Sequence, residues 1–141
     1  MLGTHEGRPS YRHTIRVAYV DTDAAGVVHH SQYFRYLEQG RVELMRAVGV
    51  DYLSFERDRG LALPVVEAQL KYRAPARFDD LLALDTWLSL GSRAKLVFAS
   101  RLVRSVDSVL LHTGTVTIAC VTMPKGAICS VPEDLREKLG A

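Results

Sequence analysis

Residues 21–41, DTDAAGVVHHSQYFRYLEQGR, decide the fold, because a polar loop gives way here to a helical repeat. From Ser31 onward, apolar or small residues recur at spacings of three and four, the period of a helix that buries one face. These residues are Tyr33, Tyr36, Leu37, Gly40, Leu44, Ala47 and Val48. Ser31 is a candidate N-cap and Gly49 a candidate stop, so the sequence predicts one long helix over residues 31–48. Gly40, near its middle, indicates either close contact with a sheet or a tolerated residue.

The segments on either side of this helix have the character of strands. Before it, YRHTIRVAYV (residues 11–20) alternates between two faces. After it, the sequence predicts strands over residues 61–75, 80–90, 94–104 and 108–123, and short helices over residues 51–60 and 131–140. Pro64 marks the first of these strands as an edge or bulged strand. A meander of antiparallel strands has an apolar face that needs a cover, and the long helix is the only large candidate. The predicted fold class is therefore α+β.

The composition fits one globular domain. The chain has 141 residues, of which 48% are hydrophobic, enough for a core. A net charge of +2 with scattered basic residues argues against a nucleic-acid partner, and no apolar run is long enough for a membrane span. We expect residues 1–10 to be a flexible N-terminal arm and residues 11–141 to be a single domain.

The cysteines and the polar N-terminus bear on location. Cys120 and Cys129 are the only cysteines and belong to no CxxC pair, so we expect reduced thiols rather than a zinc site or a disulfide framework. The N-terminus lacks the apolar core of a signal peptide. Both observations predict a cytoplasmic protein.

The loop before the helix carries residues that occur in several kinds of site. Asp21, Asp23 and Gly26 match positions 1, 3 and 6 of a calcium loop, but Ala25 and Gln32 occupy positions that need ligands. The adjacent histidines, His29 and His30, point apart and do not suit one transition metal, and there is no H-E-x-x-H motif. Glycine-rich phosphate loops and the G-x-S-x-G elbow are also missing. We therefore predict neither a metal nor another cofactor.

What remains is a carboxylate beside the N-terminus of a helix. Free N–H groups at a helix start can hold a developing oxyanion, and a nearby carboxylate can attack or activate water. The competing interpretation is that Asp21 and Asp23 make turn hydrogen bonds and that His30 or Ser31 only caps the helix. Residue types alone leave both interpretations open.

The motif is more specific than its residue types. D-x-D-x-x-G-V-V, followed two residues later by a helix that carries aromatics, resembles the acyl-CoA thioesterases of the hot-dog fold. The resemblance is greatest to the branch with the Tol-Pal-associated and Pseudomonas-type 4-hydroxybenzoyl-CoA thioesterases. YRAPARFDDLLAL (residues 72–84) also resembles a segment of that family, and the similarity covers roughly residues 11–124. It implies a hot-dog fold, in which a curled antiparallel sheet wraps around one long central helix.

The resemblance also assigns roles to individual residues. Asp23 matches the catalytic carboxylate, as nucleophile or as general base, and the backbone N–H of His30 matches the oxyanion donor. Whether the His30 ring takes part stays open. Gly26 permits a tight loop or is an ordinary turn glycine, and Tyr33 lines the acyl pocket or packs in the core. Asp21 is expected to be structural.

Other residues compete for these roles or complete the site. Another hot-dog branch uses a glutamate on the central helix, which makes Glu38 a competitor for Asp23, although an ion pair with Arg41 explains it as well. His112 is expected to be a surface or core histidine. The basic residues Arg93 and Lys95 follow LGS, where the family places groups for the CoA phosphates. Arg73 and Arg77 are weaker candidates.

The function implied is hydrolysis of an acyl-CoA thioester, with an acyl group that is small and aromatic, or aliphatic and of short or medium length. The alternatives are a hot-dog acyl hydratase or dehydratase, and a non-catalytic acyl-CoA-binding module. Because one hot-dog unit leaves an open sheet edge and half a pocket, a homodimer or homotetramer is expected.

Overall fold

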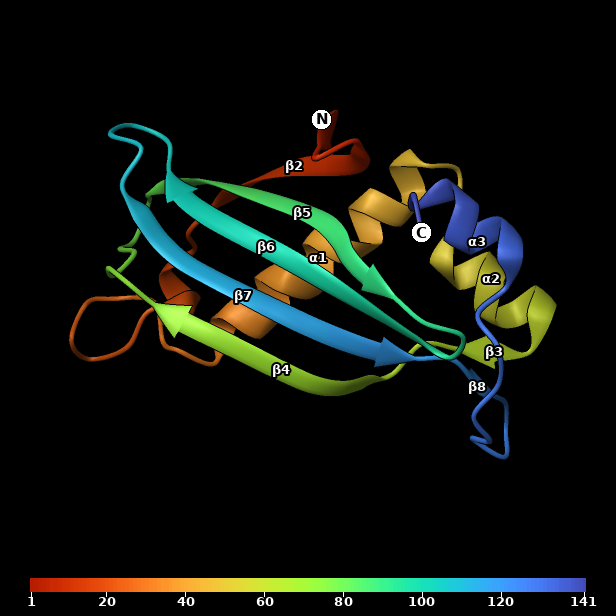
Figure 1. Ribbon diagram of the computed structural model, residues 1–141. Coiled ribbons are helices and arrows are strands. Elements are labelled where there is room, and N and C mark those ends of the chain that lie inside the picture. Colours follow the sequence, from red (N-terminus) through yellow and green to blue (C-terminus); the bar gives the residue numbers. More distant parts are fainter.

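The computed structural model describes residues 1–141 and consists of a curled antiparallel sheet that holds one long helix against its inner face (Figure 1). The six strands, in the order in which they pair, are β1 (Leu2–His5), β2 (Arg8–Arg16), β5 (Leu81–Gly91), β6 (Lys95–Arg104), β7 (Leu110–Ala119) and β4 (Val65–Tyr72). A second sheet pairs β3 (Leu61–Ala62) with β8 (Val121–Thr122). The helices are α1 (Gln32–Ala47), α2 (Tyr52–Arg59) and α3 (Glu133–Lys138), with a 3₁₀ turn η1 at Tyr19–Asp21. The predicted α+β class and central helix are confirmed.

Both ends of α1 lie within one residue of their predicted positions. Gly49 follows the helix with φ of +95°, a left-handed conformation that glycine adopts without strain. Its N–H donates to the Arg46 carbonyl at 3.0 Å, and the Val50 N–H donates to the Met45 carbonyl at 2.8 Å, which closes the last turn. At the other end Ser31 occupies the N-cap position, but its side chain makes no capping bond.

Gly40 brings α1 into close contact with the sheet. A Cβ added there would lie 2.6 Å from Thr86 Oγ1 and 2.9 Å from Leu84 Cδ2, both on β5. No side chain larger than hydrogen fits this gap without movement of the neighbours. Of the two interpretations of Gly40, close contact is therefore confirmed. This contact also sets the distance between α1 and the sheet. Tyr36, Leu37 and Leu44 of α1 are buried.

The segment expected to be a flexible arm is instead a β-hairpin. Residues 2–5 pair with residues 8–11 of β2, and the His5 ring stacks on Trp87 with centroids 3.8 Å apart. This pairing depends on contacts far apart in sequence, which composition does not reveal. Two predicted strands are also shorter than expected. The segment 61–75 splits around Pro64 into β3 and β4, and the segment 108–123 splits at Cys120 into β7 and β8.

One edge of the sheet is long and unpaired. β4 pairs with β7 on one side only, and Figure 1 shows it along the full length of the sheet as its outer strand. Val65, Val66 and Tyr72 on this strand are exposed. None of the helices is long and apolar enough to cross a membrane.

Candidate active site

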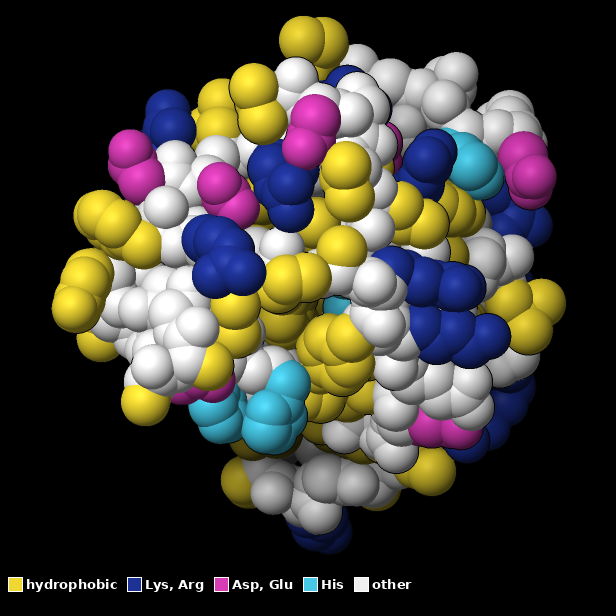
Figure 2. All heavy atoms as spheres, turned by 90° about the vertical axis from the view of Figure 1, so that its left-hand side faces the viewer, with side chains coloured by type: hydrophobic (Ala, Val, Ile, Leu, Met, Phe, Trp, Pro, Cys, Tyr) yellow, Lys and Arg dark blue, Asp and Glu magenta, His cyan; other side chains and the backbone are white.

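The loop between β2 and α1 meets the end of β4 at a cavity of about 370 Å³. The residues that line it are Asp23, Val27, Val28, His30, Tyr33, Tyr72, Arg73, Ala74 and Pro75. Figure 2 views this end of the molecule and shows a hollow with apolar side chains inside it and histidines on its edge. The predicted residues Asp23, His30 and Tyr33 therefore come together on one surface.

Asp21 links the loop to α1 through a hydrogen bond and an ion pair. Its carboxylate is buried, accepts a hydrogen bond from the Tyr36 hydroxyl at 2.8 Å, and pairs with the Arg35 guanidinium. Burial and this carboxylate both raise the pKa of Tyr36, so its hydroxyl stays a donor. The backbone carbonyl of Asp21 accepts from the His29 N–H at 2.9 Å. These contacts give Asp21 a structural role, as the sequence predicts.

Asp23 is exposed and lies at the start of a tight turn. Its carbonyl accepts from the Gly26 N–H at 2.9 Å, and its Oδ1 accepts from the Ala25 N–H, also at 2.9 Å. This is the Asx turn of the competing interpretation. The bond engages one carboxylate oxygen and orients the group, while Oδ2 has no hydrogen bond. The turn and a reactive role are thus compatible.

The backbone N–H of His30 has no acceptor in the protein, although the peptides on both sides of it are held. The His29 N–H donates to the Asp21 carbonyl at 2.9 Å, and the His30 carbonyl accepts from the Tyr72 hydroxyl at 3.0 Å. A free N–H in a fixed backbone at a helix start is the kind of group that stabilises an oxyanion. The sequence predicts no role for Tyr72, which lies within the strand predicted over residues 61–75 and is the last residue of β4 in the structure.

A model of the thioesterase-like superfamily matches residues 17–139, which is most of the chain. The chain belongs to the thioesterase-like superfamily. The acyl-CoA thioesterase YbgC of Haemophilus influenzae is 33% identical over 122 residues, which cover 86% of this chain and 88% of that protein.

Solved structures share the fold. The hypothetical protein TT1821 of Thermus thermophilus is 38% identical, with a TM-score of 0.83 and coverage of 92% of this chain and 95% of that one. A 4-hydroxybenzoyl-CoA thioesterase solved with 4-hydroxybenzoyl-CoA has a TM-score of 0.86 at 20% identity, with coverage of 93% and 99%, and shares the fold. The predicted hot-dog fold and the predicted resemblance are confirmed.

Aromatic rings form the inner wall of the Asp23 cavity. Tyr33 is buried, and its ring stacks on His112 with centroids 5.2 Å apart and an interplanar angle of 5°. Tyr72 packs edge-on against Tyr33 at 5.2 Å. His112 is 0% exposed, neither ring nitrogen has a hydrogen-bond partner, and burial lowers its pKa to about 4. Of the two expectations for His112, the core position holds.

The basic residues divide between the two ends of the sheet. Arg93 and Lys95 lie at the connection from β5 to β6, at the end of the sheet opposite the Asp23 loop (Figure 1). Arg93 donates to Ser130 Oγ at 2.9 Å. Arg73, a weaker candidate in the sequence, lines the cavity itself. Within one chain, therefore, Arg93 and Lys95 do not join the site.

Two other candidates lie away from the cavity. Gly26, with φ of +79°, belongs to the Asp23 turn and is not among the residues that line the cavity. Glu38 lies on α1 beside a different cavity, together with Arg41.

The cysteines do not form a nucleophilic site. Cys120 Sγ lies 3.3 Å from Cys129 Sγ, and burial with this contact raises the pKa of the Cys120 thiol to about 12. A thiol that holds its proton so strongly is a poor nucleophile at neutral pH. No three His, Cys, Asp or Glu side chains lie together in a way that could hold a metal ion.

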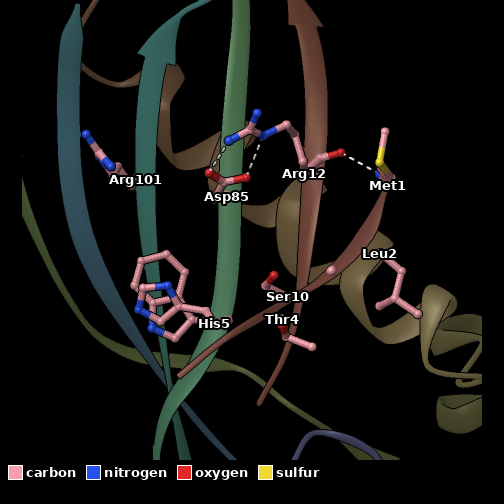
Figure 3. Close-up of a pocket in the computed structure, with 10 residues that line it drawn as sticks. Met1, Leu2, Thr4, His5, Ser10, Arg12, Asp85 and Arg101 are labelled. Atoms are coloured by element: carbon pink, nitrogen blue, oxygen red, sulfur yellow. Dashed lines mark hydrogen bonds and ion pairs between the residues drawn. The ribbon is translucent and has the colours of Figure 1, made fainter. Parts of the chain in front are cut away.

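A further cavity, of about 310 Å³, lies on the outer face of the sheet beside the N-terminal hairpin (Figure 3). Its one carboxylate, Asp85, accepts two hydrogen bonds from the Arg12 guanidinium, at 2.9 and 2.8 Å, as the dashed lines in Figure 3 show. Both of its oxygens are thus engaged. This cavity therefore offers no free carboxylate beside a helix start, unlike the Asp23 cavity.

Proposed function

We propose that this protein is an acyl-CoA thioesterase that hydrolyses a thioester to a free acid and CoA. The observation that carries the proposal is that Asp23, with a free carboxylate oxygen, and His30, with an unbonded N–H, line one cavity. The YbgC relative is named for the same activity, at 33% identity over most of both chains. The two-part arrangement is the one that acyl transfer to water requires.

The chemistry follows from these two groups. The thioester carbonyl oxygen accepts a hydrogen bond from the His30 N–H, which strengthens as negative charge develops on that oxygen. Asp23 then acts in one of two ways. As nucleophile, its oxygen bonds to the carbonyl carbon, the CoA thiolate leaves, and water hydrolyses the mixed anhydride. As general base, it takes a proton from a water that attacks the same carbon.

A dimer formed through β4 supplies the remaining parts. Antiparallel pairing of two β4 strands covers the unpaired edge, and it brings the β5–β6 end of one subunit to the Asp23 end of the other. The partner's Arg93 and the partner's Lys95 then lie near the mouth of this cavity, where they bind CoA phosphates together with Arg73. Further association of two dimers gives a homotetramer. A CoA-bound substrate and unbridged cysteines support a cytoplasmic location.

The test is a hydrolysis screen of aromatic and aliphatic acyl-CoAs in which released thiol is measured. Asp23→Asn should lower kcat by about 10³-fold or more, the range found when a nucleophile or base is removed. Asp58→Asn, the same change at an exposed position on α2, is the matched control and should leave turnover unchanged. Near wild-type hydrolysis by Asp23→Asn would refute the role of this carboxylate.

The same assay separates the alternatives. A hydratase or dehydratase alters the acyl chain without releasing thiol, and a binding module retains acyl-CoA intact. Single turnover in ¹⁸O-water then tests the nucleophilic role of Asp23. A nucleophilic carboxylate acquires ¹⁸O when water attacks the anhydride at the Asp23 carboxyl carbon, whereas a general base never acquires it.

A further inference from the structure

Arg41 is a half-buried cation without a partner. It lies on the middle of α1 and lines a cavity of about 260 Å³ whose other walls are mainly apolar, among them Val42, Met45 and Phe98. None of the hydrogen bonds or ion pairs within the chain involves its guanidinium, and its burial lowers its pKa. Glu38, one turn away, is exposed, and its carboxylate is not within ion-pair distance.

Such an arrangement needs an acceptor from outside the subunit. A guanidinium in apolar surroundings loses hydration, and hydrogen bonds to an oxygen compensate for that loss. The volume is large enough for a ligand group, since a cavity of about 150 Å³ already holds benzene. Glu38 and Tyr52 also line this cavity, but neither of their oxygens accepts a hydrogen bond from Arg41, which leaves the guanidinium free for an acceptor on a bound molecule.

The position of this cavity at one end of β4 indicates which bound molecule supplies the acceptor. Val65, the first residue of β4, lines the Arg41 cavity, and Tyr72, the last, lines the Asp23 cavity. In one subunit these ends are about 23 Å apart, at 3.3 Å per residue. When two β4 strands pair antiparallel about a twofold axis, each end meets the opposite end of the other strand. The Arg41 cavity of one subunit then adjoins the Asp23 cavity of the other.

We propose that Arg41 lies at the far end of the partner's acyl pocket and donates hydrogen bonds to an oxygen carried by the acyl group. The inference rests on the proposed thioesterase function and on pairing through β4. The thioester carbonyl lies at Asp23 and His30 of one subunit, and the acyl group extends into the apolar cavity that ends at Arg41 of the other. The preferred substrates are therefore acyl-CoAs with a hydroxyl or carboxylate at the end remote from the thioester.

Matched substrates test the selectivity. Benzoyl-CoA is compared with 4-hydroxybenzoyl-CoA, and hexanoyl-CoA with adipoyl-CoA. In the better-hydrolysed pair, the wild type should favour the oxygen-bearing member by about 10- to 100-fold in kcat/KM, the range for a hydrogen bond to a charged group. Arg41→Met should abolish this preference, and Arg41→Lys should keep part of it. Arg46→Met is the matched control, because Arg46 is exposed on the same helix and pairs with Glu43. A wild type without the preference, or an Arg41→Met variant that keeps it, would overturn the proposal.

Hybrid dimers test whether Arg41 acts across the interface. Asp23→Asn and Arg41→Met chains are co-expressed with different tags, and the mixed dimer is isolated through both. If each site takes Asp23 from one chain and Arg41 from the other, the hybrid has one intact site and recovers about half of wild-type turnover. If both residues serve the site of their own chain, every site is defective and the hybrid is no more active than its parents.

The failures are distinguishable. A wild-type protein that hydrolyses no acyl-CoA contradicts the proposed function itself. Wild-type hydrolysis with an inactive hybrid contradicts only the inference about Arg41. If Asp23→Asn stays active, the proposed role of Asp23 is wrong and the hybrid dimer is uninformative. The substrate selectivity of Arg41→Met then tests the inference about Arg41 by itself.

Discussion

The buried His112 should make the protein sensitive to acid. Its side chain is fully enclosed and has no hydrogen-bond partner, and burial lowers its pKa from 6.5 to about 4. Below pH 6.5 the unfolded chain binds a proton at this imidazole while the folded protein does not. Stability contributed by the neutral ring is therefore present above pH 6.5 and is lost as the pH falls towards 4.

The magnitude follows from the two pKa values. A difference of about 2.5 units corresponds to about 3 kcal/mol in total, of which about 2 kcal/mol is lost between pH 7.5 and pH 5. His112→Leu keeps the apolar volume and removes both nitrogens. The variant does not suffer this loss. As the pH falls from 7.5 to 5, the free energy of unfolding of His112→Leu should therefore rise by about 2 kcal/mol relative to that of the wild type.

Urea denaturation followed by circular dichroism at pH 7.5, 6.5, 5.5 and 5.0 measures this difference, and other titrating groups cancel in the comparison. His30→Leu removes an exposed imidazole and serves as the control for the loss of a histidine side chain. A constant gap between wild type and His112→Leu across the whole range would refute the reasoning, because it would mean that His112 is hydrated or hydrogen-bonded in solution.

Three further substitutions test the contacts that shape the site. Gly40→Ala should destabilise by about 1–2 kcal/mol in thermal denaturation, since overpacking outweighs the gain in helix propensity, and adding Thr86→Ala should restore most of it. Tyr72→Phe removes the hydroxyl that holds the His30 carbonyl and should lower kcat/KM about 3- to 10-fold, whereas the exposed Tyr19→Phe should not. Asp21→Asn should cost about 1–2 kcal/mol in urea denaturation, because Arg35 and Tyr36 lose a charged acceptor, whereas Asp23→Asn should leave stability nearly unchanged.

Local patterns predict the parts of the fold that local forces determine. The spacing of apolar residues and the glycine at the end locate α1 to within one residue, and Pro64 marks the break that precedes the edge strand β4. The N-terminal hairpin was not predictable in this way. Its glycines and proline are typical of a loose segment, and what orders it is pairing with β2 together with the stacking of His5 on Trp87, 82 positions apart in sequence (87 − 5).

The site was only partly predictable for the same reason. Apolar periodicity and the capping signals predict where α1 begins, and so predict that the Asp23 loop precedes its N-terminus. The hydrogen bond from the Tyr72 hydroxyl to the His30 carbonyl joins residues 42 positions apart, and no spacing rule predicts such a bond. His112 follows the inward alternation of β7, yet alternation alone does not show that its nitrogens lack partners. Arg93 and Lys95 lie at the far end of the sheet within one chain, and their proposed place at the site requires a second subunit, which a single sequence does not describe.

The two aspartates of the loop show why residue type alone could not separate structure from chemistry. Both are carboxylates, two positions apart, and both accept hydrogen bonds from nearby backbone N–H groups. Asp21 also binds Arg35 and Tyr36, so its charge is fully engaged inside the protein. Asp23 uses one oxygen in the turn and leaves the other without a hydrogen bond, and it lines the same cavity as His30, whose N–H is unbonded. The first carboxylate holds the loop against the helix, and the fixed loop in turn holds the second carboxylate in the position from which we propose that it reacts.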